Sequence, residues 1–339
     1  MRWKWLRRGA AGLAVVLLIA GVWTGTHWSA LRIRYAANRL ESAASEDERT
    51  RWADSLAARG DEGTDRLLAL LRTNDASVRA SVAAALERHL QGMTANDPRG
   101  AVLGEKLLDQ FANGSGDSCE SLVGTLPRIL DDCGALHREK CRNAVATALK
   151  LPSVAGRLAA IRAAMNPEVD LRGAIVPLLD AAEPEVRRAA LFAVGPATDA
   201  ATVIGDEELF RWLHDADGGV RALCREALLS RGRTETEIGL GRRLADPEPG
   251  ERLKLLLDLR YDDLADPEPW LERLSRDANP GVRAGAVRVM MELAAVRRLP
   301  VPPWVVKMQD SDPDATVQRI ARFYFTAYQG RLAATQRGV

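Results

Sequence analysis

Three residues of this sequence have a spacing that could hold a metal ion: Cys133, His137 and Cys141 recur every four positions. On one continuous helix their side chains would lie within about 80° of one another, and Cys119 could add a fourth ligand for zinc. Zinc sites usually take their ligands in two close pairs, which this set lacks. Ala144 would share the same helix face, and free cysteines are among the most buried residues. The pattern favours buried thiols, and we predict no metal-ligating residues.

Disulfide formation is the other chemistry open to these cysteines, because an exported domain would allow it. Two helical turns would separate Cys133 from Cys141 by about 12 Å, too far for one bridge. Cys119 could pair with either, and the sequence leaves that choice open. Cys224 takes the place of a small core residue in the repeats described below, so we expect it to be buried.

Other catalytic signatures are missing from the sequence. It has four histidines, no HExxH or GxSxG motif and no glycine-rich phosphate loop. The glycine-rich segment 229–243 is typical of a turn followed by a helix. Adjacent aspartates (131–132 and 262–263) are typical of solvated helix caps in a chain with 27% charged residues. We therefore predict no catalytic residues, no cofactor and no enzymatic activity.

The composition predicts an all-α protein. Apolar residues make up 47% of the chain but aromatic residues only 5%, and abundant Ala, Leu, Arg and Glu favour packed helices over sheets. Residues 1–40 contain seven basic and no acidic side chains, whereas residues 41–339 contain 40 basic and 46 acidic ones, a net charge of −6. Nucleic-acid binding requires clustered positive charge, so we expect no nucleic-acid partner.

An uncharged N-terminal segment predicts a membrane anchor. Residues 9–28 would form a helix about 30 Å long, which matches one hydrocarbon core. Trp3 and Trp5 precede this segment, and Trp23 and Trp28 lie at its far end. Amphipathic rings at both edges are favoured at the two membrane interfaces, so we predict a transmembrane helix at 9–28.

A cleaved signal peptide is the alternative for the same segment. Its basic start and apolar run fit, but the small residues required around a cleavage site are missing. Cleavage after Ala30 would put Trp28 two residues upstream, and cleavage after Gly25 would put Trp23 there. An uncleaved anchor is therefore favoured. The positive-inside bias slightly favours a cytoplasmic N-terminus, with the body of a single-pass inner-membrane protein outside the cytoplasm.

Internal similarity indicates the fold. Six segments begin with a helix-capping residue, continue with Val and usually Arg, and then place apolar residues four and seven or eight positions after the Val. Val78 is followed in this way by Val82, Ala85 and Leu86, which form one stripe on one helix. The segments are Asp75-ASVRASVAAAL, Pro152-SVAGRLAAI, Glu183-PEVRRAALFAV, Asp217-GGVRALCREAL, Asn279-PGVRAGAVRVM and Asp312-PDATVQRIARFYF.

The spacing of these segments defines a repeat. The later valines lie at positions 154, 186, 220, 282 and 317, in steps of 32, 34, 62 and 35 residues. The step of 62 contains a degenerate copy at 246–259, and a second, weaker helix precedes each marked one. The unit is therefore a helix–turn–helix of 31 to 35 residues. Such a pair cannot bury its own stripe, but stacked pairs form a continuous core.

The cap followed by V-R-x-x-A resembles the second helix of HEAT repeats, and the short period looks like that of bilin-lyase-type repeat proteins. The resemblance covers about residues 46–329 and implies a right-handed α-solenoid of stacked antiparallel helix pairs. It also implies a structural role for the arginine after each valine, which we expect to pair with acidic caps along the stack. These arginines are Arg79, Arg187, Arg221 and Arg283. The sequence departs from the pattern at Gln318, which replaces Arg, and between residues 91 and 150.

The predicted organisation runs from an N-terminal anchor to a free tail. In order, we expect an anchor at 1–28, a juxtamembrane helix or cap at 29–45, the repeat solenoid at 46–329 with an irregular insertion near 91–150, and a flexible tail at 330–339. The turn-forming segment 113–117 and Pro127 interrupt the helices of the insertion.

These patterns favour a non-catalytic, membrane-anchored scaffold that binds protein partners through the solenoid surface. We expect no small-molecule substrate. An accessory lyase-like or cofactor-handling protein that uses a solenoid groove is the alternative from another class, and it would need converging titratable residues. Trp212 and Trp270 each lie on the first helix of a repeat, where anchoring of the core is favoured over a binding face.

Overall fold

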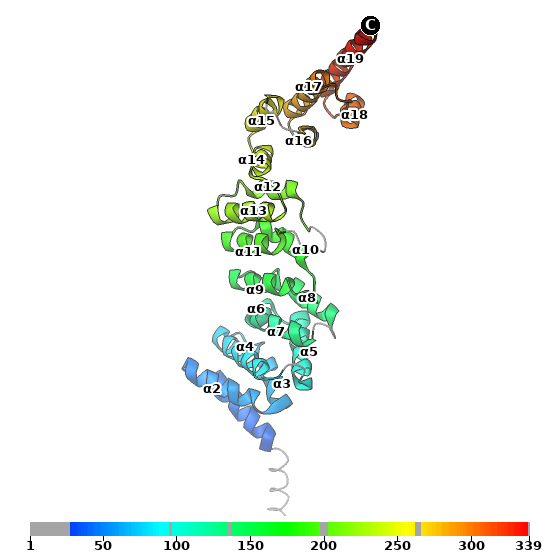
Figure 1. Ribbon diagram of the computed structural model, residues 1–339. Coiled ribbons are helices and arrows are strands. Elements are labelled where there is room, and N and C mark those ends of the chain that lie inside the picture. The colour runs from blue at the N-terminus through cyan, green and yellow to red at the C-terminus, as the bar shows by residue number, and fades with distance from the viewer. Residues whose placement is uncertain (1–27, 95–96, 134–136, 197–202, 262–265, 338–339) are drawn as a thin grey trace, which may run out of the picture. The chain divides into compact units, whose positions relative to one another are not determined.

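The computed structural model describes the chain at residues 28–94, 97–133, 137–196, 203–261 and 266–337. Every regular element in these ranges is helical, as Figure 1 shows, so the predicted all-α class is confirmed. None of the helices in these ranges is long and apolar enough to cross a membrane. The predicted transmembrane helix at 9–28 lies outside the described residues except for Trp28.

The chain divides by its contacts into an N-terminal unit, residues 1–193, and a C-terminal unit, residues 194–339. The N-terminal unit begins with a helix at 28–41. Its further elements are α2 (Glu46–Ala57), α3 (Gly60–Leu70), α4 (Ala76–Gln91), α5 (Pro98–Asn113), α6 (Gly116–Leu122), the 3₁₀ turn η1 (Val123–Thr125), α7 (Leu126–Cys133), α8 (Arg138–Ala148), α9 (Val154–Ala164), α10 (Arg172–Ile175), the 3₁₀ turn η2 (Val176–Asp180) and α11 (Pro184–Val194).

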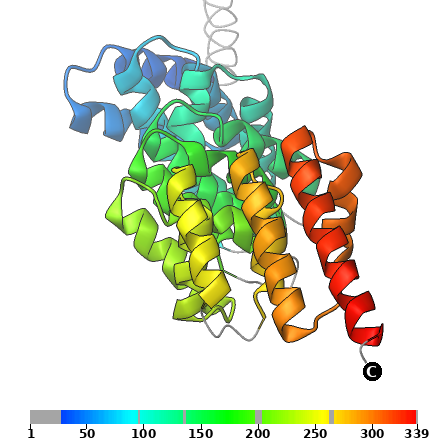
Figure 2. The ribbon, with the colours of Figure 1, turned by 90° about the horizontal axis from the view of Figure 1, so that it is seen from above.

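The C-terminal unit consists of four helix pairs. The second helices α15, α17 and α19 pack in sequence, and Figure 2 shows them side by side in yellow, orange and red. The pairs are α12 (Asp206–Trp212) with α13 (Gly218–Ser230), α14 (Glu235–Leu244) with α15 (Pro249–Tyr261), α16 (Glu268–Leu274) with α17 (Pro280–Arg297), and α18 (Pro303–Ser311) with α19 (Ala315–Arg337).

The second helices α4, α13 and α17 begin at side-chain caps, as predicted. The carboxylate of Asp75 accepts from two backbone N–H groups of α4 at 2.8 and 3.3 Å. Asp217 caps α13 at 2.9 Å, and Asn279 caps α17 at 2.8 and 3.3 Å. Each cap satisfies donors that have no partner within the helix and contributes about 1 kcal/mol.

The stripes predicted from the repeat pattern form the core. Val78, Val82 and Leu86 of α4 are buried, as are Val186 and Ala190 of α11. These side chains lie four and eight positions apart, on one face of each helix. The stacked-pair architecture is therefore confirmed, whereas the right-handed sense of the stacking stays a prediction.

Helix α9 carries its stripe in a different register from the one predicted. Val154 is only half-buried, whereas Gly156 and Ala160 are buried. The helix is capped by Ser153, whose hydroxyl accepts from the N–H of Gly156 at 3.0 Å. Because the cap sets the position of the first buried residue, the stripe begins three residues after Ser153. Arg157 then occupies the place of the repeat arginine.

The insertion near 91–150 contains a broken second helix. Helix α6 passes through the 3₁₀ turn η1 into α7, with Pro127 at the start of α7. Proline has no N–H and cannot continue the helical ladder of the preceding turn. The segment 113–117 forms the corner between α5 and α6, where Ser115 caps α6.

Two other predicted segments differ in the structure. The first helix before α11 is reduced to α10 and the 3₁₀ turn η2, because Pro177 interrupts it. At the C-terminal end, α19 continues to Arg337, so most of the predicted tail 330–339 is helical. The residues after Gly330 are good helix formers without a further breaker until Gly338.

Two glycines of the C-terminal unit allow close approach between helices. A Cβ atom at Gly241 of α14 would overlap the ring of Phe210 on α12, and one at Gly285 of α17 would overlap the side chain of Leu256 on α15. Glycine is required at both positions because a side chain would not fit. Its backbone freedom is not the reason, since neither glycine has a positive φ.

Candidate functional site

Buried ion pairs join the last three helix pairs of the C-terminal unit, and together with Gln318 we call these residues the arginine relay: Arg252, Asp277, Arg283, Asp312 and Gln318. The guanidinium of Arg283 donates to both carboxylate oxygens of Asp312 at 2.9 Å. Arg252 donates in the same bidentate way to Asp277, at 2.6 and 3.0 Å. Each arginine lies on the second helix of one repeat, and each aspartate lies in the turn of the next.

The turn aspartates are used twice. The backbone carbonyl of Asp277 accepts from Arg283 Nη1 of its own repeat at 2.9 Å, while its carboxylate accepts from Arg252 of the preceding one. The carbonyl of Asp312 likewise accepts from Gln318 Nε2 at 2.7 Å. Arg252 and Arg283 therefore each bind their own turn and the turn of the next repeat, which holds adjacent repeats in one register.

The hydrogen bond from the arginine to a carbonyl of its own turn recurs in repeat after repeat. In each case the arginine lies four residues after the cap. Its guanidinium donates to the backbone carbonyl six residues before the arginine, in the turn between the two helices. The bonds are Arg79 to Thr73 (2.8 Å), Arg187 to Ala181 (2.9 Å), Arg221 to Asp215 (2.7 Å), Arg252 to Asp246 (2.5 Å) and Arg283 to Asp277 (2.9 Å).

Ion pairs along the stack also occur in the N-terminal unit. Arg79 lies 3.1 Å from Asp117, and Arg157 lies 2.9 Å from Glu183. Arg79 and Arg283 therefore pair with acidic residues along the stack, but these partners are not the predicted N-caps, because Ser115 caps α6 and Asp314 caps α19. Hydrogen bonds from Arg283 lower the pKa of Asp312, and the same bonds raise the pKa of Arg283. Both groups stay charged, as a structural ion pair requires.

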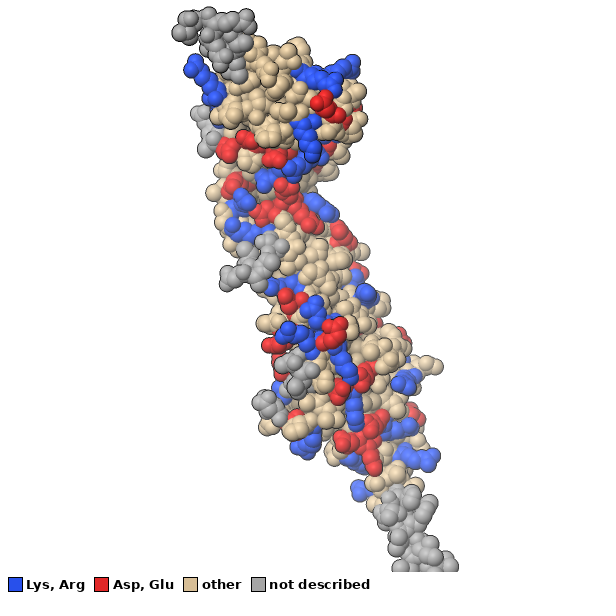
Figure 3. Space-filling view, turned by 90° about the vertical axis from the view of Figure 1, so that its right-hand side faces the viewer, with Lys and Arg blue, Asp and Glu red and all other residues tan. Residues whose placement is uncertain are grey.

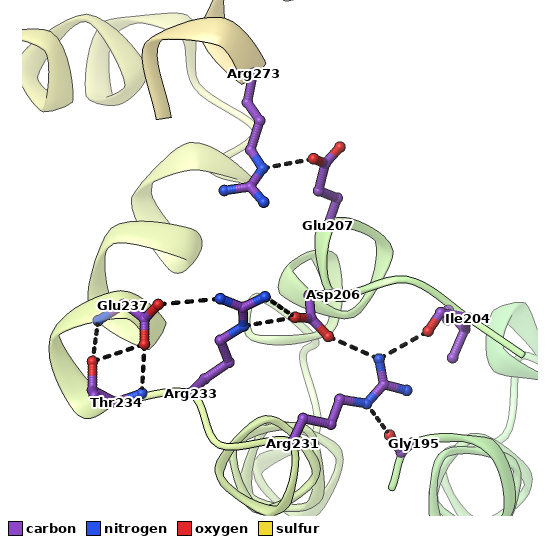
Figure 4. Close-up of polar contacts among 9 residues, drawn as sticks. All are labelled: Gly195, Ile204, Asp206, Glu207, Arg231, Arg233, Thr234, Glu237 and Arg273. Carbon is purple, nitrogen blue, oxygen red and sulfur yellow. Dashed lines mark hydrogen bonds and ion pairs between the residues drawn. The ribbon is translucent and has the colours of Figure 1, made fainter. Parts of the chain in front are cut away.

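A second polar cluster joins the first two helix pairs of the C-terminal unit, as Figure 4 shows. Asp206, at the start of α12, accepts from Arg231 at 2.9 Å and from Arg233 at 2.7 Å. Arg233 also donates to Glu237 at 3.1 Å, and Glu237 closes a capping box with Thr234. The turn followed by a helix that the sequence predicted at 229–243 is thus confirmed.

The arginines of this cluster fix the start of the unit. Arg231 has its side chain almost fully buried and donates to the carbonyls of Gly195 (2.7 Å) and Ile204 (2.8 Å). Burial alone would raise the pKa of Asp206, but the hydrogen bonds from Arg231 and Arg233 outweigh it and lower that pKa. A carboxylate neutralised by two guanidinium groups is a poor proton acceptor. The cluster is therefore structural.

The cysteine and histidine set that could have bound zinc does not lie on one helix. Helix α7 ends at Cys133 and α8 begins at Arg138, with His137 between them. The predicted single helix was wrong, because the backbone of His137, with φ of −125° and ψ of 38°, is not helical. Among the described residues, no group of three His, Cys, Asp or Glu side chains could hold a metal ion.

The described thiols are unreactive core groups. Cys119, Cys141 and Cys224 are free and buried, so Cys119 and Cys141 do not pair with each other. Burial raises the pKa of Cys119 and Cys141, and it raises that of Cys224 to about 12. The prediction that Cys224 lies in the core is confirmed. The side chain of Cys133 lies outside the described residues.

The two repeat tryptophans lie in the core, as favoured from the sequence. Trp212 and Trp270 are both buried. The Trp270 ring lies 6.1 Å from that of Phe210 between centroids, and the guanidinium of Arg273 lies 5.1 Å above it. These aromatic residues anchor α12 and α16 and are not available as a binding face.

A row of exposed side chains follows the second helices of the C-terminal unit, and we call it the outer row: Leu253, Leu257, Arg288, Arg319 and Phe323. Leu257 is 53% exposed and Phe323 67% exposed. Leu257, Arg288 and Phe323 occupy the same position on α15, α17 and α19, six residues after the first stripe position. Arg319, Phe323 and three neighbours line a hollow of about 500 Å³.

The outer row was not found from the sequence. The predicted stripes contain only positions expected to be buried. The sequence signal for the outer row is a large apolar residue six positions after the stripe begins. Phe192 occupies that position on α11 of the N-terminal unit and is 63% exposed. Isolated exposed apolar residues are normal, but recurrence at one repeat position is typical of a contact surface.

Charge is finely mixed on the face of the molecule that Figure 3 presents. Basic and acidic side chains alternate there, and no large area of one sign is visible. Elsewhere in the described chain, ion pairs join neighbouring helices, such as Lys140 with Glu105 and Asp109 at 2.9 Å. That face lacks the continuous positive field by which proteins attract nucleic acid.

The helices and their joints define a helical-repeat protein. No family model matches its sequence, and no curated protein does. Among solved structures, the YibA protein of Escherichia coli is similar at 19% identity, covering 84% of this chain and 98% of that one, with a TM-score of 0.36.

Two further solved structures are similar at the same level. Human deoxyhypusine hydroxylase in complex with glycerol is 16% identical over 91% of this chain and 99% of that one, with a TM-score of 0.29. An engineered protein is 16% identical over 88% and 98%, with a TM-score of 0.26. Such low TM-scores carry no argument about fold or activity, so the architecture rests on the contacts of this chain itself.

Proposed function

We propose that the chain is a non-catalytic, membrane-anchored scaffold of HEAT-like repeats that binds protein partners through the outer row. The observation that carries this proposal is the exposure of Leu257 and Phe323 at one repeat position. Exposed apolar and arginine side chains on a rigid surface are the usual components of protein interfaces. The proposal includes no small-molecule substrate, cofactor or nucleic acid.

The arginine relay supports a scaffold because it makes the surface rigid. Its ion pairs hold α15, α17 and α19 in fixed register, so the outer row is pre-organised for a partner. A surface that is ordered before binding loses less conformational entropy on association. The buried carboxylates that a catalyst would need, Asp206, Asp277 and Asp312, are each engaged by arginine.

The membrane anchor is supported by the sequence alone. The uncharged segment 9–28 is long enough to span a bilayer. An inner-membrane location with the repeats outside the cytoplasm follows from the slight excess of basic residues before the span. Anchoring would confine a partner to the membrane and raise its effective concentration there.

The test is crosslinking and affinity capture of the tagged full chain from membranes, followed by mass spectrometry. The double variant Leu257→Lys, Phe323→Lys removes the two most exposed apolar side chains of the outer row without touching the core. Val306→Lys is the matched control, because Val306 is also exposed but lies on the first helix α18. A partner that is lost in the double variant and retained in the control supports the proposal.

Exchange of residues 1–28 for an unrelated anchor tests protein binding by the repeats separately from membrane anchoring. The partner should still be captured if the repeats bind it. Capture that is unchanged in the double variant would exclude the outer row as the interface. Recovery of a small molecule in place of any protein would favour a cofactor-handling protein instead.

A further inference from the structure

The helix at 28–41 and α2 form a hollow of about 450 Å³ at the start of the described chain. Six residues line it, and we call them the entry patch: Trp28, Leu31, Arg32, Tyr35, Trp52 and Arg59. Three of the six are aromatic, two are arginines and none is acidic. Trp28 is 57% exposed and Tyr35 59% exposed, so large rings face solvent beside positive charge.

The aromatic rings of the patch are held in place. The rings of Tyr35 and Trp52 meet edge to face, with 5.8 Å between centroids and an interplanar angle of 84°. The Trp52 indole N–H donates to Glu48 at 3.5 Å, and Arg39 lies over the same ring at 6.0 Å. The helix at 28–41 is therefore fixed on α2, and its own buried side chains, such as Ala36 and Leu40, complete the packing.

Among the described residues, no acidic side chain forms an ion pair with either arginine of the patch. Nη1 of Arg59 is buried without a hydrogen-bond partner. No ion pair or hydrogen bond joins Arg32 to any described residue. Burial and then the nearby charge of Arg32 lower the pKa of Arg59. Because two arginines and no acidic residue line the hollow, it is suited to an anion that accepts from both arginines.

The position of the patch in the chain identifies the anion. Trp28 ends the uncharged segment 9–28, and Tyr35 lies about 10 Å further along the helix, at 1.5 Å per residue. The headgroup layer on each side of a bilayer is about 5–8 Å thick. If the segment spans the membrane, the patch must lie at the level of the lipid phosphates. Tryptophan and tyrosine rings favour that level, and arginine binds phosphate there.

We infer that the entry patch docks on the surface of an anionic bilayer, with Arg32 and Arg59 binding lipid phosphate and the aromatic rings entering the interface. This inference rests on the anchor of the proposed function. Docking would add a second point of attachment beside the anchor. It would therefore fix the orientation of the N-terminal unit relative to the membrane.

The test uses the full chain in vesicles, with an environment-sensitive NBD fluorophore on Leu31→Cys. Cys133→Ser is introduced so that its thiol does not compete for the label, and the other three cysteines are buried. NBD on Val102→Cys is the control, because Val102 is exposed on α5 of the same unit and outside the patch. The vesicles contain phosphatidylcholine alone or phosphatidylcholine with phosphatidylglycerol.

In vesicles with phosphatidylglycerol, the label at position 31 should shift to the blue and be quenched by lipids that carry a nitroxide in the headgroup region. The label at position 102 should show neither effect. One arginine near an anionic surface favours the bound state by about fivefold, so Arg32→Glu with Arg59→Glu should lower the docked-to-undocked ratio by at least about 30-fold, since reversal removes two attractions and adds repulsion. Arg32→Lys with Arg59→Lys should retain docking, because the charge is kept.

Other results would overturn the inference. Docking that is equal in phosphatidylcholine and unchanged by charge reversal would exclude phosphate binding. A label signal that follows the protein-to-lipid ratio would identify a second copy of the chain as the occupant. Carbonate extraction separates this failure from failure of the anchor: an undocked variant that resists extraction leaves the anchor intact, whereas a wild-type chain that is extracted refutes both.

Discussion

Removal of the carboxylate of Asp312 should uncouple the last repeat of the C-terminal unit. Asp312→Ala leaves the guanidinium of Arg283, whose side chain is only 10% exposed, without the two bonds of 2.9 Å that neutralise it. Loss of one partner of a buried ion pair costs about 3–5 kcal/mol. At about 1.4 kcal/mol per factor of ten, opening of α18 and α19 should become more frequent by two to nearly four orders of magnitude.

Native-state hydrogen exchange of the α19 amides measures this effect directly, because local opening of a terminal repeat need not unfold the rest. Asp310→Ala is the matched control. Asp310 lies two residues away and forms an ion pair of the same length with Arg322, but its side chain is 84% exposed. Its removal should change α19 exchange by less than about fivefold. Equal effects of the two substitutions would refute the argument from burial.

The same ion pair predicts a dependence on pH with a definite sign. Hydrogen bonds from Arg283 lower the folded-state pKa of Asp312. The stabilisation is therefore complete above the pKa of an unfolded aspartate, about 3.9, and is lost as the pH falls through the lower folded-state pKa. In Asp312→Ala this part of the acid dependence of α19 protection should disappear. An acid dependence equal to that of the wild type would show that another group is responsible.

Three further predictions concern the core. Val186→Asp places an unpaired charge at a fully buried position and should lower the melting temperature sharply; unchanged melting would refute the stripe assignment. Gly241→Ala should lower the free energy of unfolding by about 1–3 kcal/mol, because the new methyl group overlaps Phe210. Gly239→Ala, in open space on the same helix, is its control and should stabilise slightly; equal effects would exclude the overlap. Cys224, whose pKa is raised to about 12, should react with a thiol reagent at pH 8 only after unfolding, and rapid labelling of the native chain would show that it is accessible.

Local patterns were the part of the fold that could be predicted from the sequence. Caps such as Asp75 and Asn279 act over two or three residues, and their helices begin where expected. The register of α9 failed because a valine was used as the marker. The distance of four residues from Ser153 to Arg157 would have placed it correctly, since both side chains bind near the turn.

Contacts between distant residues could not be predicted. Asp206 is bound by Arg231 and Arg233, which follow it by 25 and 27 residues, and any of several arginines in this chain could have filled those places. The pairing depends on how two helix pairs stack, which no local pattern contains. The exposed outer row was missed for the opposite reason, because Leu257 and Phe323 are single residues in helices whose buried stripes carry the stronger signal.

The arginine relay gives this chain a simple route to change in length during evolution. A repeat of the C-terminal unit carries both halves of its joint: an aspartate in the turn that receives the arginine before it, and an arginine or its equivalent that reaches the turn after it. A tandem duplication of residues 277–311 would therefore add a module that carries Asp277 to receive the preceding arginine and Arg283 to reach the following turn. Residue Gln318 makes the bond to its own turn but carries no charge, so a module of its type would add no arginine that a following turn must neutralise.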